Sequence, residues 1–476
     1  MHIDRKDVQG LLRTSYPKAR HAAYHLLEIA DGNAAKAWLA GLMESITFAQ
    51  KQHASEEHLN IAFTAAGLEK LGLPHDAMQT FPGAFREGMP REHRAAILGD
   101  VGPSAPQKWD WGGTTGTGAH AGRLHILLLA FAHSSAGLAA LNASLSGRFG
   151  TAVVALPGSP LATREFDSDK NIEHFGFRDG ISQPLIKGIN DEAAREKATS
   201  YSSVVEPGEF ILGYKNSQGL LPPSPSVAEA EDPSGILKHA APGLAGRRDL
   251  GRNSSFLVFR HLAQNVPAFW NYVHAASPTG TQRSLDACEP VAAKLVGRWC
   301  NGSPLAKAWK RPDPRLEQCN DFAYRDDDAA GLRCPVGAHI RRAAPRDSLA
   351  DTRKNGLIST NLHRLLRRGR SYGEALEGEA KFSGDPADRG LYFICLNASV
   401  ERQFEFVQQT WINGNKVGGL YDERDPIAGN PQGGGTFSIP GVPPRNVLTG
   451  MPSFVTVKGG GYFFLPGRAA LVFLST

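Results

Sequence analysis

The sequence is poor in cysteine, and the cysteines it has form no recognisable pattern. There are five in 476 residues, at positions 288, 300, 319, 334 and 395, and no two of them form a C-x-x-C pair. An odd and scattered set argues against a disulfide framework, and the missing C-x-x-C pairs argue against a structural zinc site. We therefore expect reduced thiols, as in a cytoplasmic protein.

Long apolar runs and a strong charge of one sign are also missing. No stretch approaches the ~18 consecutive apolar residues of a membrane helix, and residues 1–7 are polar with no apolar segment behind them. No secretory or twin-arginine signal is therefore visible. The 52 basic and 47 acidic residues leave a formal charge of +5, too small at this length to indicate nucleic-acid binding. We expect a cytoplasmic protein with neither a membrane nor a nucleic acid as partner.

A phosphate-binding loop is excluded as well. The three glycines at 459–461 are followed by Tyr462 and Phe463 rather than by Lys-Ser or Lys-Thr, which such a loop requires. The sequence predicts a tight turn into a strand at this point.

The length exceeds what one hydrophobic core usually serves, so two core units are expected. Hydrophobic periodicity predicts strands and helices that follow each other in similar order in each half, which favours two α+β sandwiches with a break between 155 and 170. The predicted helices cover 34–46, 65–71, 138–145, a segment around 269–272, and 404–411. The predicted strands cover 7–12, 59–64, 124–132, 209–214, 255–260, 391–396 and 469–474.

Three segments carry residues suited to chemistry. Residues 173–184 read EHFGFRDGISQP and place Asp179 on a glycine-flanked turn; glycine permits close backbone approach to a bulky group. Alone, Asp179-Gly180 is typical of an ordinary turn that caps a strand. Residues 334–342, CPVGAHIRR, add His339 beside arginines, and residues 365–373, LLRRGRSYG, add a second arginine cluster.

With these segments in this order, the chain resembles the dye-decolourising peroxidase family over nearly its whole length. The resemblance implies two tandem ferredoxin-like domains at 1–165 and 166–476, each an antiparallel sheet with flanking helices, as in the dimeric α+β barrel-like superfamily. It also implies one haem b per chain, held by the C-terminal domain. One departure is visible, because Ala344 stands where family members often have Asn before Pro345-Arg346.

The family's proximal iron ligand corresponds to His339. Such an imidazole usually donates its other N–H to a carboxylate, and Asp425 is the candidate by its position after the ligand. Arg341, Arg342 or Arg346 could pair with a haem propionate, since guanidinium groups suit carboxylates. The sequence leaves the choice among these arginines open.

On the peroxide side, the resemblance assigns catalysis to Asp179 and Arg367. An acid/base can move the proton between the peroxide oxygens, and a permanent guanidinium charge can stabilise the parting oxygens. Further cofactor contacts are implied for four residues, Ile181, Ser182, Leu391 and Phe393.

The implied reaction reduces hydrogen peroxide and oxidises an organic reductant such as a phenol or an anthraquinone dye. Tyr372 and Trp411 are candidates for carrying electrons from bulky donors at the surface, although plain core packing is the favoured explanation for both. Two rival functions remain: a chlorite-dismutase-type haem protein, against which Asp179 argues, and a haem-binding or iron-release protein with little turnover. Whether the chain forms an oligomer is left open.

Overall fold

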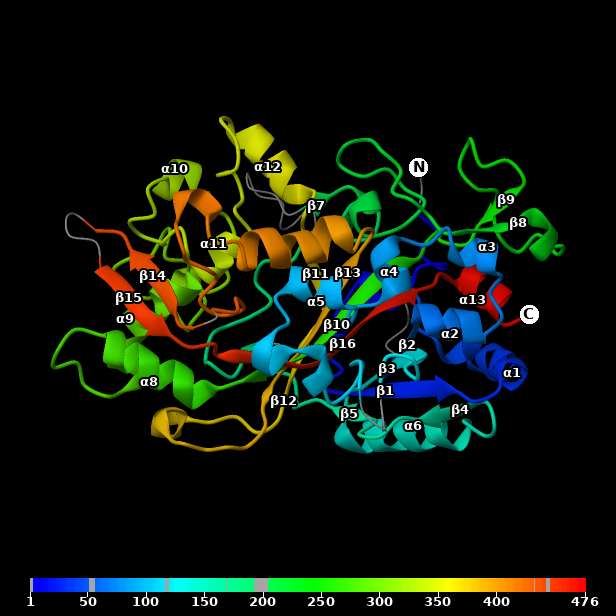
Figure 1. Cartoon of the computed structure of the whole chain (residues 1–476), viewed down its shortest axis with the longest axis horizontal. Helices are drawn as coiled ribbons and strands as arrows, with labels where there is room; N and C mark the ends of the chain where they lie inside the picture. The colour runs from blue at the N-terminus through cyan, green and yellow to red at the C-terminus, as the bar shows by residue number, and fades with distance from the viewer. Residues whose placement is uncertain are drawn as a thin grey trace.

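A single antiparallel sheet of ten strands runs through the computed structural model, with helices packed around it (Figure 1). The structure describes residues 3–50, 56–115, 120–167, 169–191, 204–431, 433–441 and 446–476. Each half of the chain contributes one end of the sheet. The predicted α+β class is thereby confirmed.

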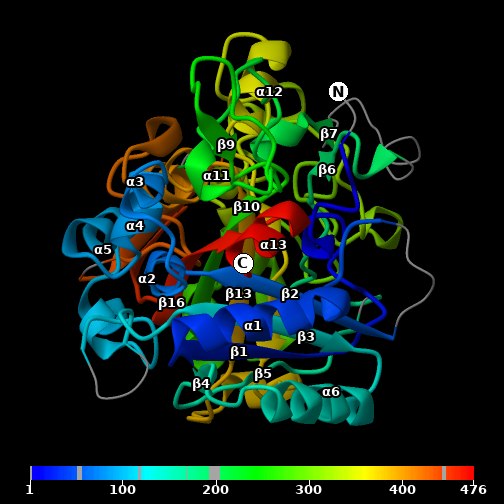
Figure 2. The same ribbon diagram turned by 90° about the vertical axis from the view of Figure 1, so that its right-hand side faces the viewer.

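The N-terminal half has the strand order β4-β1-β3-β2, which is the ferredoxin-like arrangement. Figure 2 views the molecule from this half, with α1 and β1 toward the viewer. Its elements are β1 (His21–Ile29), α1 (Gly32–Leu42), β2 (Glu57–Phe63), β3 (Ile126–Ala132), α6 (Ser135–Gly147), β4 (Val153–Ala155) and β5 (Leu161–Ala162). Between β2 and β3 lie the short helices α2 (Ala65–Lys70), α3 (His75–Met78), α4 (Gly83–Glu87) and α5 (Glu92–Leu98).

The C-terminal half repeats the pattern with the order β11-β13-β10-β16. Its framework consists of β10 (Ser255–Gln264), α8 (Val266–Ala276), α9 (Leu285–Val296), β11 (Leu366–Arg367), β12 (Arg370–Tyr372), β13 (Gly390–Asn397), the π-type helical segments η9 (Glu401–Glu405) and η10 (Val407–Ile412), and β16 (Val455–Leu465). Insertions carry α11 (His339–Ala343), α12 (Arg353–Asn361), and the hairpin β14 (Gly435–Ile439) and β15 (Asn446–Met451); α13 (Arg468–Leu474) closes the chain.

The two halves share backbone and side-chain contacts. Strands β2 and β16 pair at Phe63 and Phe464, which makes the two sheets continuous. Arg368, in the turn after β11, and Arg370, the first residue of β12, donate to the carbonyls of Leu11 and Ala19 at 2.7 Å each. Arg368 and Arg370 are therefore buried and link the two halves by hydrogen bonds, rather than lying in solvent.

The glycines at 459–461 lie inside β16 and do not form the turn that the sequence predicts. A Cβ on Gly459 would lie 2.6 Å from Cε2 of Trp111, and one on Gly460 would lie 2.6 Å from Sδ of Met89. Side chains from the N-terminal half therefore pack directly on the backbone of β16, and only glycine leaves room for them.

Three predicted strands are wrong. Residues 7–12 contain the short 3-10 helix Gly10–Leu12, and residues 209–214 form turns in which Gly213 has φ +85°. Residues 469–474 belong to α13, whose buried residues Ala470, Leu471 and Leu474 follow helical spacing. A short apolar run does not distinguish a buried strand from a buried helix. Strand β1 was missed because His21, His25 and Glu28 interrupt its apolar pattern.

All five cysteines are free thiols, as expected. Among the helices that the structure describes, none is both long and apolar enough to span a bilayer.

Candidate active site

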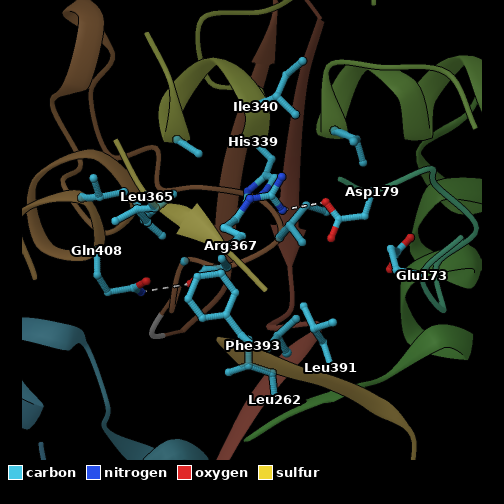
Figure 3. A pocket seen from close by; sticks show the side chains of 18 of the residues that line it. Glu173, Asp179, Leu262, His339, Ile340, Leu365, Arg367, Leu391, Phe393 and Gln408 are labelled. Carbon is cyan, nitrogen blue, oxygen red and sulfur yellow. Dashed lines mark hydrogen bonds and ion pairs between the residues drawn. The ribbon is translucent and has the colours of Figure 1, made fainter. Parts of the chain in front are cut away.

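A cavity of about 320 Å³ opens in the C-terminal half, between α11, the turn that carries Asp179, and the strands β10, β13 and β16. Figure 3 shows His339 at one end, Leu262, Leu391 and Phe393 at the other, and Asp179 and Glu173 along one side. Most of its wall is apolar, with contributions from Leu262, Ile340, Leu365, Leu391, Phe393 and Phe404.

His339 is the first residue of α11 and lines the cavity. Its Nδ1 lies 2.9 and 3.0 Å from the two carboxylate oxygens of Asp425. Backbone N–H groups of Ile427 and Ala428 also donate to Asp425, at 2.9 and 2.8 Å. The backbone donors fix the carboxylate, and the carboxylate holds the imidazole in place through Nδ1, which leaves Nε2 for the cavity.

Charge pairing dominates the titration of these two groups. Burial works to lower the pKa of His339, but Asp425 outweighs it and the pKa is raised. Burial works to raise the pKa of Asp425, but the imidazole and the backbone donors lower it. In the neutral imidazole, the hydrogen bond from Nδ1 to Asp425 keeps the hydrogen on Nδ1, and this tautomer offers Nε2 as an electron-pair donor.

Asp179 and Arg367 meet at the same cavity. Arg367 Nη1 donates to Asp179 Oδ1 at 2.6 Å, and the N–H of Gly180 donates to the same oxygen at 2.6 Å. Gly176 and Gly180 have φ of +108° and +83°, conformations that glycine adopts without strain. The two glycines allow the turn that aims the carboxylate at Arg367.

The pKa of Asp179 has two opposing influences, which the sequence alone does not rank. Burial raises it, whereas the charge and hydrogen bond of Arg367 and the N–H of Gly180 lower it. The result is a lowered pKa, so Asp179 remains a carboxylate into the acidic range.

The structure places the four further contact residues on the cavity wall. Ile181 and Ser182 follow Asp179 on its turn. Leu391 and Phe393 point into the cavity from alternate positions of β13 (Figure 3), whereas Tyr392 between them packs on the opposite face of the sheet.

Two of the three arginines that the sequence offers as candidates for a propionate, Arg341 and Arg342, are directed elsewhere in the structure. Arg342 is buried and donates to the carbonyls of Trp411, Ile412, Gly414 and Glu423. Arg341 donates to the carbonyls of Asp328 and Cys334 and lies over the ring of Tyr324. Neither side chain lines the cavity, because the guanidinium groups of both donate their hydrogen bonds to carbonyls of the loops around α11.

Arg346 and Arg364 line the cavity instead. Arg346 is oriented by the carbonyls of Asn320 and Phe322, both at 2.9 Å. Nη2 of Arg364 is buried without a hydrogen-bond partner among the described residues. Burial, with Arg346 and Arg367 nearby, lowers the pKa of Arg364 to about 10. The sequence analysis missed Arg364, although it stands three residues before Arg367.

These features fit a haem group. The volume and apolar wall suit a flat macrocycle, a single imidazole suits its iron, and the unpartnered guanidinium of Arg364 suits a propionate. In the part of the chain that the structure describes, no three His, Cys, Asp or Glu side chains gather as a metal site.

Tyr372 and Trp411 are both buried, with 6% and 4% of their surface exposed. Tyr372 stacks on Tyr392 with ring centroids 4.5 Å apart. Trp411 packs against His363 and Phe406. Neither ring lies at the surface, so a bulky donor would not touch either one directly.

Comparison with known proteins gives one consistent result. No family model matches the chain. A dye-decolorizing peroxidase of Mycena epipterygia is 30% identical over 451 residues, which cover 87% of this chain and 75% of that protein. Dye-decolorizing peroxidase msp1 of Mycetinis scorodonius is 28% identical over 496 residues, covering 98% and 86%. The solved structure of an ancestral D-type dye decolorizing peroxidase matches with a TM-score of 0.78 and 27% identity, over 99% of each chain.

Proposed function

The chain belongs to the dye-decolorizing peroxidase family, and we propose that this haem peroxidase oxidises phenols and anthraquinone-type dyes with hydrogen peroxide as the oxidant. The observation that carries the proposal is the cavity that joins a carboxylate-supported His339 to the Asp179–Arg367 pair. An imidazole alone would suit many haem proteins. The paired acid/base and guanidinium are what peroxide chemistry requires in addition.

We assign His339 as the iron ligand of one haem b per chain. Asp425 orients its ring and makes it more electron-rich through the hydrogen bond to Nδ1. Arg346 and Arg364 are assigned to the propionates, with Ile181, Ser182, Leu391 and Phe393 in contact with the macrocycle. When bound, the haem would supply the iron that cleaves the O–O bond and stores the oxidising equivalents.

Proton transfer is assigned to Asp179. Its carboxylate takes the proton from one oxygen of peroxide and returns it to the other, which leaves as water. Arg367 keeps the carboxylate ionised and offers its remaining N–H groups to the negative charge that develops on the separating oxygens.

Electron transfer from donors too large for the cavity is assigned to Tyr372 and Trp411 as relays rather than as contact points, because both rings are buried. Hydrogen peroxide and an organic reductant are then the partners of the reaction.

The test begins with His339→Ala. Haem retention, followed by the Soret band of the purified protein, and peroxide-dependent dye oxidation should both be lost. A variant that keeps full haem and full turnover would exclude His339 as the ligand. The rival function, haem binding or iron release, predicts instead a normal Soret band in the unmodified protein with negligible peroxide turnover.

A further inference from the structure

The cavity is not built by the C-terminal half alone. Residues 98–100, where α5 ends, belong to the N-terminal half and line the cavity beside Gln408 and Asn430 of the C-terminal half. Gln408 lies on the side of the cavity opposite Asp179 (Figure 3). Since the proposed proton transfer and iron ligation use only residues of the C-terminal half, the contribution of α5 to the cavity has another purpose.

The end of α5 is joined to two asparagines of the C-terminal half. The last carbonyls of a helix have no N–H partner within the helix. Asn413 Nδ2 donates to the carbonyl of Leu98 at 2.8 Å, and Asn430 Nδ2 donates to the carbonyl of Gly99 at 2.8 Å. The N–H of Asn430 donates in turn to Oδ1 of Asn413 at 3.0 Å. The two side chains and the end of α5 thus form a closed ring of hydrogen bonds, here called the asparagine ring.

Asn430 is also the last residue of the turn that begins at Asp425. The N–H of Gly429 donates to the carbonyl of Asp425 at 3.1 Å and closes this turn. A Cβ on Gly429 would lie 2.4 Å from that carbonyl oxygen, so only glycine lets the turn close so tightly. Gln408 adds a second connection, because its Nε2 lies 3.4 Å from the carbonyls of both Leu98 and Ala428. The turn 425–430 is therefore held by α5 at one end and supports the imidazole at the other.

We propose that the end of α5 acts on the iron ligand through this turn. Asn413 and Asn430 are positioning residues that fix Asp425, and Asp425 in turn fixes His339. The inference rests on the ligand assignment in the proposed function and adds a role for the N-terminal half. A hydrogen bond at Nδ1 makes the imidazole more electron-rich, and such bonds tune the reduction potential of haem iron. Loosening the asparagine ring should weaken this bond and raise the ferric–ferrous potential.

The ferric–ferrous potential of the haem-loaded protein, measured without peroxide, tests the asparagines. Asn430→Ala removes the donor to Gly99 and should raise the potential; it should also lower the iron–imidazole stretching frequency in the resonance Raman spectrum of the ferrous protein. Asp425→Asn should shift both readings further in the same directions. Adding Asn430→Ala to Asp425→Asn should give no further shift, because Asn430 acts through Asp425.

The matched control for this pair of measurements is Asn271→Ala. Asn271 Nδ2 donates to the carbonyl of Phe382 at 3.1 Å, and neither residue lines the cavity. The control therefore loses a comparable hydrogen bond and should keep the potential and the stretching frequency of the unmodified protein.

The contribution of the N-terminal half is tested at Gly99, which has φ +73°. A Cβ there would lie 2.6 Å from Nδ2 of Asn413, so Gly99→Ala should displace this side chain and shift both readings as Asn430→Ala does. Gly102→Ala is the matched control. Gly102 also has a positive φ, +61°, but a Cβ there would meet no atom within 4 Å. This variant carries similar backbone strain and should leave both readings unchanged.

Hydrogen exchange of residues 424–431 reports on the turn directly, in variants and parent protein matched for haem content. Exchange should be about fivefold faster in Asn430→Ala and Gly99→Ala, as expected for the loss of one hydrogen bond, and unchanged in both controls. Unchanged potentials in Asn430→Ala and Gly99→Ala, or a shift that adds in full to that of Asp425→Asn, would overturn the proposal. If the unmodified protein shows no iron–imidazole band, the ligand assignment fails, while the exchange rates still decide whether α5 holds the turn.

Discussion

At the scale of single residues, two aspartates of the site differ in the cation that each one faces. Asp425 is paired with the imidazole of His339, whereas Asp179 is paired with the guanidinium of Arg367. Asp425 is 1% exposed and is held by backbone donors, whereas the Asp179 side chain is 33% exposed. The first arrangement suits a fixed support, and the second suits a group that must exchange protons with a small substrate.

The proton-transfer role predicts a kinetic defect at Asp179. Asp179→Asn keeps the shape but removes the base, so the step in which peroxide reacts should slow by about 10²–10⁴-fold. Arg367→Leu should also slow it, because it removes the charge at the separating oxygens. Stopped-flow mixing with peroxide measures the rate, with Asp76→Asn as an exposed control in the N-terminal half. Unchanged rates in both Asp179→Asn and Arg367→Leu would contradict the assigned roles.

The lowered pKa of Asp179 predicts an acidic working range. The base must be ionised, and its pKa lies below the ordinary value, so activity is present above that pKa and is lost as pH falls through it. We expect dye oxidation to be best between about pH 3 and 5, where a histidine base would already be protonated. Arg367→Leu removes the main group that lowers the pKa of Asp179, whereas burial still raises it. The fall in activity on the acidic side of the pH–rate profile should therefore move to higher pH. A pH–rate profile in which that fall stays in place, or an optimum above neutrality, would exclude Asp179 as the titrating base.

The sequence could predict much of the site at this scale because the residues stand in motifs with a defined spacing. His339, Asp179, Arg367 and Asp425 are brought together as expected. The arginines that face the cavity could not be chosen from the sequence, because the burial and the direction of each side chain decide which ones they are. Arg341 and Arg342 face carbonyls of the surrounding loops, whereas Arg364 faces the cavity.

At the scale of elements, β16 requires glycine at 459 and 460 because of side chains that pack on its backbone, and the local sequence does not show this packing. The side chains that cover them, Trp111 and Met89, come from the other half of the chain, more than 300 residues earlier. In the same way, the apolar run at 469–474 could be read as a strand or as a helix until its neighbours were known. Strands β2, β10 and β13 were predicted because their apolar and aromatic residues form a local pattern.

The packing on β16 predicts a stability change. Gly459→Ala places a methyl group against the indole of Trp111 and should lower the free energy of unfolding by about 1–3 kcal/mol, as overpacked substitutions do. Gly41→Ala is the matched control: it lies in α1 with open space around it and should raise stability by about 0.5–1 kcal/mol. Urea denaturation of both variants measures the difference. Equal stabilities would mean that Trp111 moves aside at no cost.

At the scale of the whole molecule, the two halves are tied together by more than the sheet. The buried guanidinium of Arg370 donates to the carbonyls of Ser15, Tyr16 and Ala19 and lies between the rings of Phe131 and Phe166. These contacts fasten the segment before β1 to the C-terminal half. The domain boundary at 165/166 stays a prediction.

Removing this tie should loosen the N-terminal segment. Arg370→Met leaves three carbonyls without their buried donor and should lower the free energy of unfolding by about 2–4 kcal/mol. Proteases should then cut more rapidly in residues 11–19 of the folded protein. Arg148→Met, at an exposed arginine, provides the control. A variant as stable and as protease-resistant as the parent would show that the segment is held without Arg370.

The pairing of β2 with β16 has a consequence for biosynthesis. Strand β2 is complete at Phe63, but its partner residue Phe464 leaves the ribosome about 400 residues later. The sheet of the N-terminal half is complete at Ala155, about 310 residues before Phe464. At ~5–20 residues per second, it therefore keeps one edge unpaired for roughly 15–60 seconds. An unpaired edge invites association with other chains. Nascent molecules therefore pass through an interval in which this edge is open to other chains.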